Sequence, residues 1–183
     1  FFQRKPAEFY RFYQAKMLCD TAKPNAAHKK LAKLEAQGKL KAIVTQNIDN
    51  LHQMAGSKKV LELHGSVYRN HCVKCHSFYD FAYMKENKGI PRCSKCGGII
   101  KPDVVLYEEA LDQDILKEAI HAIAHADTLI IGGTSLSVYP AASLVDYFSG
   151  KHLVVINRDK TPQDGMAELV INQPIGEVFE QIK

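Results

Sequence analysis

Short apolar runs recur along this chain and predict buried strands. Three of them, rich in aliphatic and β-branched residues and without polar alternation, span residues 41–45, 128–132 and 152–156. Runs of this kind are typical of parallel strands that are covered on both faces. A fourth strand-like run, residues 60–63, ends at His64.

Helical periodicity occurs both before the first of these runs and between the later ones. Apolar residues recur three or four positions apart over about 6–17, 26–37, 112–125 and 141–148. Strand and helix therefore alternate, which predicts a doubly wound α/β domain with a parallel sheet. In the first helix Phe9, Phe12, Tyr13 and Met17 recur at helical spacing, and we expect the three aromatic side chains to lie in the core.

The composition is that of an ordinary globular protein. Of the 183 residues, 46% are hydrophobic and 24% are charged, and the net charge is +4. A chain of this size forms one domain, or one domain with a small appendage. The positive charge is too small and too scattered to indicate nucleic-acid binding, and no apolar run approaches the roughly 20 residues of a membrane helix. We expect neither nucleic acid nor a membrane as a direct partner.

Four of the five cysteines form two matched pairs. They are Cys72 with Cys75 and, after 17 intervening residues, Cys93 with Cys96. This spacing is that of a zinc ribbon, in which four thiolates form a closed tetrahedral shell. A closed shell leaves no position for a reacting water, so the predicted role of the zinc is structural.

Two alternatives to zinc stay open: a pair of disulfides in a secreted protein, and a thioredoxin-like redox pair. The repetition of the pair at this distance favours a metal. Gly97 and Gly98, directly after the last cysteine, supply the backbone freedom that such a turn needs. The fifth cysteine, Cys19, is expected to pack in a helix.

Polar residues follow the carboxyl ends of three predicted strands, at residues 46–50, 133–137 and 157–159. In an open α/β sheet, ligands bind beyond these ends. One polar loop is ordinary, but three at the same edge favour a nucleotide site. The usual G-x-G-x-x-G fingerprint is absent, so this prediction rests on position alone.

His64 is a candidate general base, because it ends a strand-like run and precedes a glycine that leaves open space. The alternative is a structural histidine whose hydrogen bonds are satisfied within the fold.

Several of these stretches together resemble one family. In chain order they are Thr-Gln-Asn-Ile-Asp-Asn-Leu-His at 45–52, Leu-His-Gly-Ser at 63–66, the cysteine pairs, Lys-Pro-Asp-Val-Val-Leu-Tyr at 101–107, and Gly-Thr-Ser-Leu at 133–136. This is the order found in the sirtuins, the Sir2-type NAD-dependent protein deacylases, and the resemblance is to the bacterial type. It implies a cytoplasmic enzyme with a Rossmann-type NAD-binding domain. That domain would comprise residues 1–66 and 102–183, with a helical module at about 1–20 and a zinc-binding module inserted at 67–101.

The resemblance also implies roles for single residues. His64 resembles the catalytic base, next to the cofactor, and Asn47 a residue that orders ribose and water. The nicotinamide and its ribose are expected to contact Gln46, Asn47, Ile48 and Asp49. The adenosine half is expected to contact Gly133, Thr134, Ser135, Asn157 and Ile175. An acetylated peptide or protein would add as a strand between two edges: Val105, Leu106 and Tyr107 on one side, and Ser137, Val138 and Tyr139 on the other.

The implied activity is lysine deacetylation, in which the acetyl group passes from acetyl-lysine to ADP-ribose and nicotinamide leaves. A neutral histidine suits the proton transfer from a ribose hydroxyl near pH 7. Two other activities stay open: ADP-ribosyl transfer to a protein, which needs the same pocket, and removal of a different acyl group. A zinc-ribbon interaction module without catalysis is a third alternative, which leaves the polar loops unexplained.

The sequence departs from the family in two places. The family's first Gly-rich turn and its arginine-bearing loop have no counterpart from Phe1 onward. We expect them before Phe1, because loss of a central strand would expose a sheet edge. Sirtuins that prefer succinyl or malonyl groups carry Tyr-x-x-Arg where this chain has Tyr-Gln-Ala-Lys at 13–16. Lysine lacks the planar fork that binds a carboxylate through two bonds, so we expect acetyl groups to be preferred.

Overall fold

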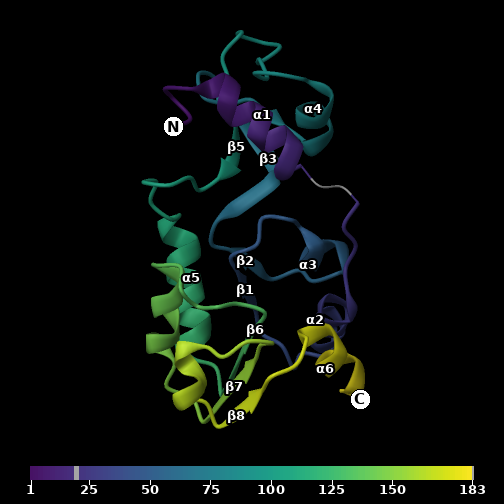
Figure 1. Ribbon diagram of the computed structural model, residues 1–183, viewed down its shortest axis with the longest axis vertical. Coiled ribbons are helices and arrows are strands. Elements are labelled where there is room, and N and C mark those ends of the chain that lie inside the picture. The colour runs from purple at the N-terminus through teal and green to yellow at the C-terminus, as the bar shows by residue number, and fades with distance from the viewer. Residues whose placement is uncertain (19–20, 183) are drawn as a thin grey trace. The chain divides into compact units, whose positions relative to one another are not determined.

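The structure is a computed structural model that describes residues 1–18 and 21–182. Its contacts divide the chain into two compact units, which we describe separately. The described part of the first unit lies within residues 1–22, 47–50 and 64–110, and that of the second within 23–46, 51–63 and 111–183. Figure 1 labels their helices and strands.

Parallel strands form the framework of the second unit. β1 (Ile43–Thr45) pairs in parallel with β2 (Val60–Glu62). A second parallel sheet has the order β6-β7-β8, from β6 (Thr128–Gly132), β7 (His152–Ile156) and β8 (Leu169–Ile171). The four predicted strands and their parallel direction are confirmed, although they pair as two sheets and β8 was not predicted.

Helices cover both faces of these strands, which confirms the doubly wound class. On one face, α2 (Ala26–Ala36) and α6 (Ile175–Gln181) lie together, as Figure 1 shows. Their buried side chains form one hydrophobic cluster with Ile156. On the other, α5 (Gln113–Ala124) and the 3₁₀ helix η1 (Ala141–Tyr147) pack on Leu61 and Leu63. The remaining helical elements of this unit are α3 (Leu51–Met54) and the 3₁₀ helix η2 (Pro162–Gly165).

Side-chain caps explain where α2 and α5 begin. The Asn25 side chain accepts a hydrogen bond from the N–H of His28, and the Asp112 carboxylate accepts from the N–H groups of Asp114 and Ile115. These bonds satisfy N–H groups that have no partner within a helix, so both starts are determined locally.

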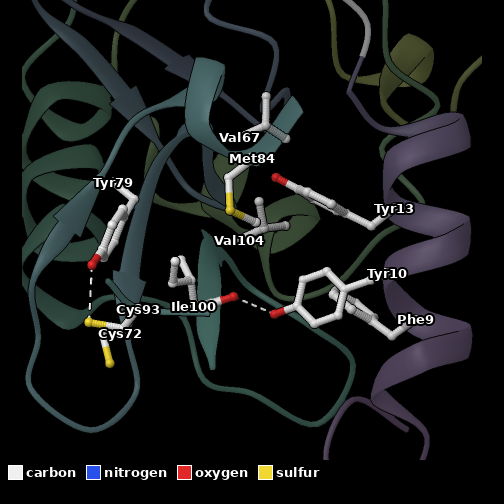
Figure 2. Packing of buried hydrophobic residues seen from close by; sticks show 10 residues of the cluster. All are labelled: Phe9, Tyr10, Tyr13, Val67, Cys72, Tyr79, Met84, Cys93, Ile100 and Val104. Carbon is white, nitrogen blue, oxygen red and sulfur yellow. Dashed lines mark hydrogen bonds between the residues drawn. The ribbon is translucent and has the colours of Figure 1, made fainter. Parts of the chain in front are cut away.

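An antiparallel sheet forms the centre of the first unit. β3 (Gly65–Cys72) lies between β4 (Phe78–Tyr79) and β5 (Ile100–Val104), and α4 (Phe81–Glu86) follows β4. Figure 2 shows α1 (Pro6–Lys16) packing its aromatic face against this sheet. The Tyr10 hydroxyl donates a hydrogen bond to the Ile100 carbonyl, so its polar end is satisfied inside the core. Burial raises the pKa of the Tyr10 and Tyr13 hydroxyls, and both therefore stay neutral.

The prediction that Phe12 lies in the core is wrong. Phe12 is 59% exposed, whereas Tyr10 is fully buried together with Phe9 and Tyr13. At 100° per residue, these three side chains occupy an arc of about 100°, and Phe12 lies about 60° outside it. Helical spacing alone therefore did not define which aromatic side chains face the sheet.

Residues 1–18 belong to the same compact unit as the cysteine-bearing strands. The sequence instead predicted a helical module within the nucleotide-binding domain, with a zinc module limited to 67–101. Compactness does not test how the functions divide, so the predicted domain boundaries stay a prediction. None of the helices in the described residues has both the length and the apolar character needed to cross a bilayer.

Candidate active site and zinc centre

The four paired cysteines meet at one point of the first unit. The sulfur atoms of Cys72, Cys75, Cys93 and Cys96 all lie within 4.8 Å of one another. Two sulfur–sulfur distances, Cys72 to Cys96 and Cys75 to Cys93, are 3.5 Å. Tetrahedral zinc with bonds of about 2.3 Å separates its sulfurs by about 3.8 Å. The donor set and its spacing fit a structural zinc, and the disulfide alternative is not what the structure forms, since these thiols are free.

The two cysteine pairs form the same backbone turn twice. In each turn, the N–H after the second cysteine donates to the carbonyl of the first, from His76 to Cys72 and from Gly97 to Cys93. Both donors have positive φ, 57° for His76 and 70° for Gly97. Glycine adopts that conformation without strain, so the expected freedom at Gly97 is confirmed. In the other turn His76 has the same left-handed conformation, which is energetically unfavourable for a residue with a Cβ.

A tyrosine that the sequence did not indicate supports this centre. The Tyr79 hydroxyl lies 3.0 Å from the Cys93 sulfur and donates to it, as Figure 2 shows. This bond is the main reason that the pKa of the Cys93 thiol falls to about 6. A thiolate is the form that binds zinc. The tyrosine lies 14 residues before Cys93 and on β4, so no local spacing pointed to it.

Gly98 is needed for space rather than for backbone freedom, which differs from the predicted reason. A Cβ at this position would lie 2.8 Å from the Cys72 sulfur and 3.4 Å from the Cys96 sulfur. We expect Gly98→Ala to lower the zinc affinity by about 10- to 100-fold, the usual range for changes next to a metal shell. Competition with a chromophoric chelator measures this. Gly165→Ala, where an added Cβ meets nothing within 4 Å, should leave the affinity unchanged.

His64 lies at the start of the first unit's sheet and is half-buried. Its carbonyl accepts the N–H of Val105 at 3.1 Å, which ties it to the chain after β5. The sequence predicted that the glycine after His64 leaves open space, and this prediction is wrong. Gly65 has φ 74°, and a Cβ there would lie 1.9 Å from the Asp103 carbonyl oxygen. Only glycine allows β5 to approach this closely, so Gly65 fixes the backbone that carries His64.

The same unit contains part of the predicted nicotinamide pocket: Asn47, Ile48 and Asp49. The Ile48 carbonyl accepts the N–H of Val67 at 3.1 Å, which joins this segment to β3 three residues beyond His64. Asn50 then adopts φ 62°, a conformation that asparagine tolerates better than most residues. The structure thus brings Ile48 and the strand that begins next to His64 together. Gln46 belongs to the second unit.

Predicted adenosine contacts gather at the carboxyl ends of β6 and β7 in the second unit. The N–H of Gly133 donates to the Ile156 carbonyl, and the N–H of Asn157 donates to the Ile171 carbonyl, both at 3.1 Å. Ile175 lies against the same place, because a Cβ added to Gly132 would meet its Cδ1 atom at 2.3 Å. Gly132 is a further residue of this site that the sequence did not single out, although two consecutive glycines at a strand end were a visible signal.

The loop after β6 is ordered by its own hydroxyl groups. The Thr134 hydroxyl accepts the N–H of Leu136 at 3.1 Å, and the hydroxyl oxygens of Ser135 and Ser137 lie 2.7 Å apart. These bonds hold Thr134 and Ser135 at the carboxyl end of β6, where the sequence predicts contacts to adenosine.

Both predicted peptide edges expose large side chains. Tyr107 is fully exposed, and Val138 and Tyr139 are 50% and 76% exposed. The two edges belong to different units. In the stretch 13–16, on which the predicted acyl preference depends, Tyr13 is fully buried in the core. The expectation for Cys19 lies outside the described residues.

Comparisons with known proteins identify the family. A model of the Sir2 family matches residues 1–140. An NAD-dependent protein deacetylase of Clostridium perfringens (strain 13 / Type A) is 63% identical over 183 residues, which are 100% of this chain and 75% of the relative. A similar protein of Clostridium acetobutylicum, with the same descriptive name, is 57% identical over the same share of each chain.

Solved structures agree with this. A complex of Sir2 with a p53 peptide and NAD+ gives a TM-score of 0.90 at 44% identity, over 99% of this chain and 78% of that one. A Sir2 complex with an inhibitor, 2'-O-acetyl-ADP-ribose and a deacetylated p53 peptide gives 0.91 at 44% identity, over 99% and 80%. The chain therefore belongs to the Sir2 family, which confirms the predicted resemblance.

Proposed function

We propose that this chain is an NAD-dependent protein lysine deacetylase, which transfers the acetyl group of acetyl-lysine to ADP-ribose and releases nicotinamide. The observation that carries this is the 63% identity, along the whole chain, to a protein named as such a deacetylase. The substrates are acetylated proteins or peptides, and NAD is consumed as the second substrate. The free thiols at the zinc centre support a reducing, cytoplasmic location.

His64 is the general base in this proposal. When the nicotinamide–ribose bond breaks, the ribose gains positive charge and the carbonyl oxygen of the acetyl-lysine captures it. His64 then removes a proton from a ribose hydroxyl, and that oxygen attacks the captured acyl carbon. A neutral imidazole near pH 7 is suited to this step. Asn47 orders the ribose and the water, and Gln46, Ile48 and Asp49 complete the nicotinamide side.

The residues predicted to contact adenosine and the peptide have the same roles in this proposal. Gly133, Thr134, Ser135, Asn157 and Ile175 hold the adenosine half, which their position at the carboxyl ends of β6 and β7 supports. The peptide adds as a strand between residues 105–107 and 137–139. Main-chain hydrogen bonds then supply most of the affinity, so the sequence preference is loose. The zinc holds its turns together and takes no part in the reaction.

The experiment that tests the function identifies the products. The full-length protein is incubated with NAD and an acetylated peptide, and all products are weighed by mass spectrometry. Deacetylated peptide, nicotinamide and O-acetyl-ADP-ribose support the proposal. A protein or peptide that gains ADP-ribose without losing acetyl assigns the chain to ADP-ribosyl transfer instead.

Among acyl groups we expect acetyl to be removed faster than succinyl, by about tenfold in kcat/KM. No guanidinium occurs in residues 13–16, and Tyr13 is buried in the core. A carboxylate on the acyl group therefore lacks the two-bond partner that would offset its desolvation. Matched acetyl and succinyl peptides measure the ratio, and a faster succinyl rate would reverse the assignment.

A further inference from the structure

The segment that follows β5 forms one tight turn. The N–H of Glu109 donates to the Leu106 carbonyl at 3.0 Å, and Glu108, the third residue of the turn, has φ 73°. A positive φ at this position is the mark of a type II turn, which normally takes glycine there. Because Glu108 adopts this conformation at a cost, other contacts must hold the turn.

Two side chains supply those contacts. The Glu109 Oε2 atom accepts the N–H of Leu106 at 3.0 Å and lies 2.9 Å from the Lys101 ammonium. Lys101, on β5, also donates to the carbonyl of Val104 at 3.1 Å. Partial burial opposes ionisation of Glu109, but the bond from Leu106 and the Lys101 charge outweigh it and lower the pKa of its carboxyl. The carboxylate is therefore charged at neutral pH and bridges β5 to the turn.

These bonds determine which main-chain groups of the segment are available. The N–H of Val105 is used by the His64 carbonyl, and the N–H of Leu106 by Glu109. In the described residues no hydrogen bond engages the N–H or carbonyl of Tyr107, and its side chain is fully exposed. β5 is also an edge strand, in the order β4-β3-β5. The segment directly follows this edge strand, and it holds a fixed conformation in which the main-chain groups of Tyr107 stay available.

We propose that Lys101 and Glu109 are positioning residues that hold Val105–Leu106–Tyr107 ready to pair with an acetylated peptide. This inference rests on the proposed deacetylase function and deepens it. The pair does not touch the substrate in this proposal. A flexible loop would lose conformational entropy each time a peptide binds. Because the pair already orders the segment, this entropy loss is smaller and the affinity is higher. The sequence offered no sign of it, because the two residues are eight positions apart, Lys101 on β5 and Glu109 in the loop that follows.

The experiment compares Glu109→Ala and Lys101→Met with Glu108→Gln in the full-length, zinc-loaded protein. Glu108→Gln removes one carboxylate charge from the same turn, but Glu108 has no side-chain hydrogen bond or ion pair in the described residues. Glu109→Ala should raise the KM for an acetylated peptide by about tenfold, because a hydrogen bond to a charged group is lost. The KM for NAD and kcat at saturating peptide should stay within about twofold, as should every constant of Glu108→Gln.

Two further variants separate positioning from general damage. Glu109→Gln keeps an acceptor for Leu106 but loses the ion pair, so its peptide KM should lie between those of wild type and Glu109→Ala. The double variant Lys101→Met/Glu109→Ala should be no weaker than the worse single variant, since both act through one bridge. Fluorescence anisotropy of a labelled acetylated peptide gives the same ranking without turnover, and thermal melting verifies that each variant is folded.

The inference is overturned if Glu109→Ala and Glu108→Gln have the same peptide KM. It is also overturned if kcat and both KM values change together in proportion to lost stability, because that is the behaviour of a purely structural pair. A wild-type protein that neither binds nor deacetylates any acetylated peptide refutes the proposed function itself, which this design therefore distinguishes from failure of the positioning role.

Discussion

Replacing His64 with alanine is expected to lower the deacetylation rate by about 100- to 10,000-fold, the usual contribution of a positioned acid or base. NAD binding should stay within about threefold of wild type. The reason is that the imidazole removes a proton late in the reaction, after the dinucleotide is bound. The main-chain carbonyl of residue 64, which accepts a hydrogen bond from the N–H of Val105, is unchanged by the substitution. Product formation by mass spectrometry and NAD binding by calorimetry measure the two effects.

A matched control exists on β3, the strand that begins next to His64. His71 is a half-buried histidine of β3 whose ring lies edge-on to Phe78, with centroids 5.6 Å apart. His71→Ala removes the same side chain seven positions away and should keep most of the activity. If His64→Ala loses NAD binding in parallel with turnover, the side chain supports the pocket and is not the base.

Periodicity and apolar runs predicted four strands and the helices α2, α5 and η1 of the second unit because their signals are local. They did not predict α3, α6 or η2. Each long strand there is a continuous apolar run, and α2 and α5 begin at side-chain caps that the sequence contains, Asn25 and Asp112. β4 has two residues, which is too short for a periodic signal. β8 is as long as β1 and β2, but its apolar run is confined to the three residues of the strand and was not singled out. The pairing of the parallel strands into two sheets was not predictable either, because it depends on contacts between distant segments.

In the candidate site, too, the features with local sequence signals were predicted and those that depend on distant segments were not. Cysteine spacing predicted the zinc centre, since each turn needs only six consecutive residues to form its hydrogen bonds. Spacing did not predict Tyr79, Gly132 or the Lys101–Glu109 bridge. Each depends on contacts that form only in the folded chain. The Tyr79 hydroxyl reaches the Cys93 sulfur, Gly132 leaves room for the Ile175 side chain, and Lys101 and Glu109 form an ion pair. The interpretation of Gly65 was wrong for the same reason, because its crowding comes from β5.

Replacing Cys93 with alanine is expected to abolish zinc binding at stoichiometric metal and to lower the free energy of unfolding by about 4 kcal/mol or more. Cys93 is buried and lies in the same hydrophobic cluster as Cys72, Tyr79 and Ile100, so the metal links the two cysteine turns to the core on which α1 packs. Loss of one thiolate leaves three ligands, opens the shell and exposes this packing to water.

Metal analysis and denaturant unfolding measure the effect, and Cys19→Ala is the control. Cys19 is a cysteine outside the paired motif, so this variant removes one thiol and should retain one zinc per chain. Adding a strong chelator to the wild type should reproduce the Cys93→Ala melting curve, because both remove the same cross-link. If Cys93→Ala keeps its zinc and its stability, the four thiols do not form a metal centre, and the first unit is held together by its aromatic core alone.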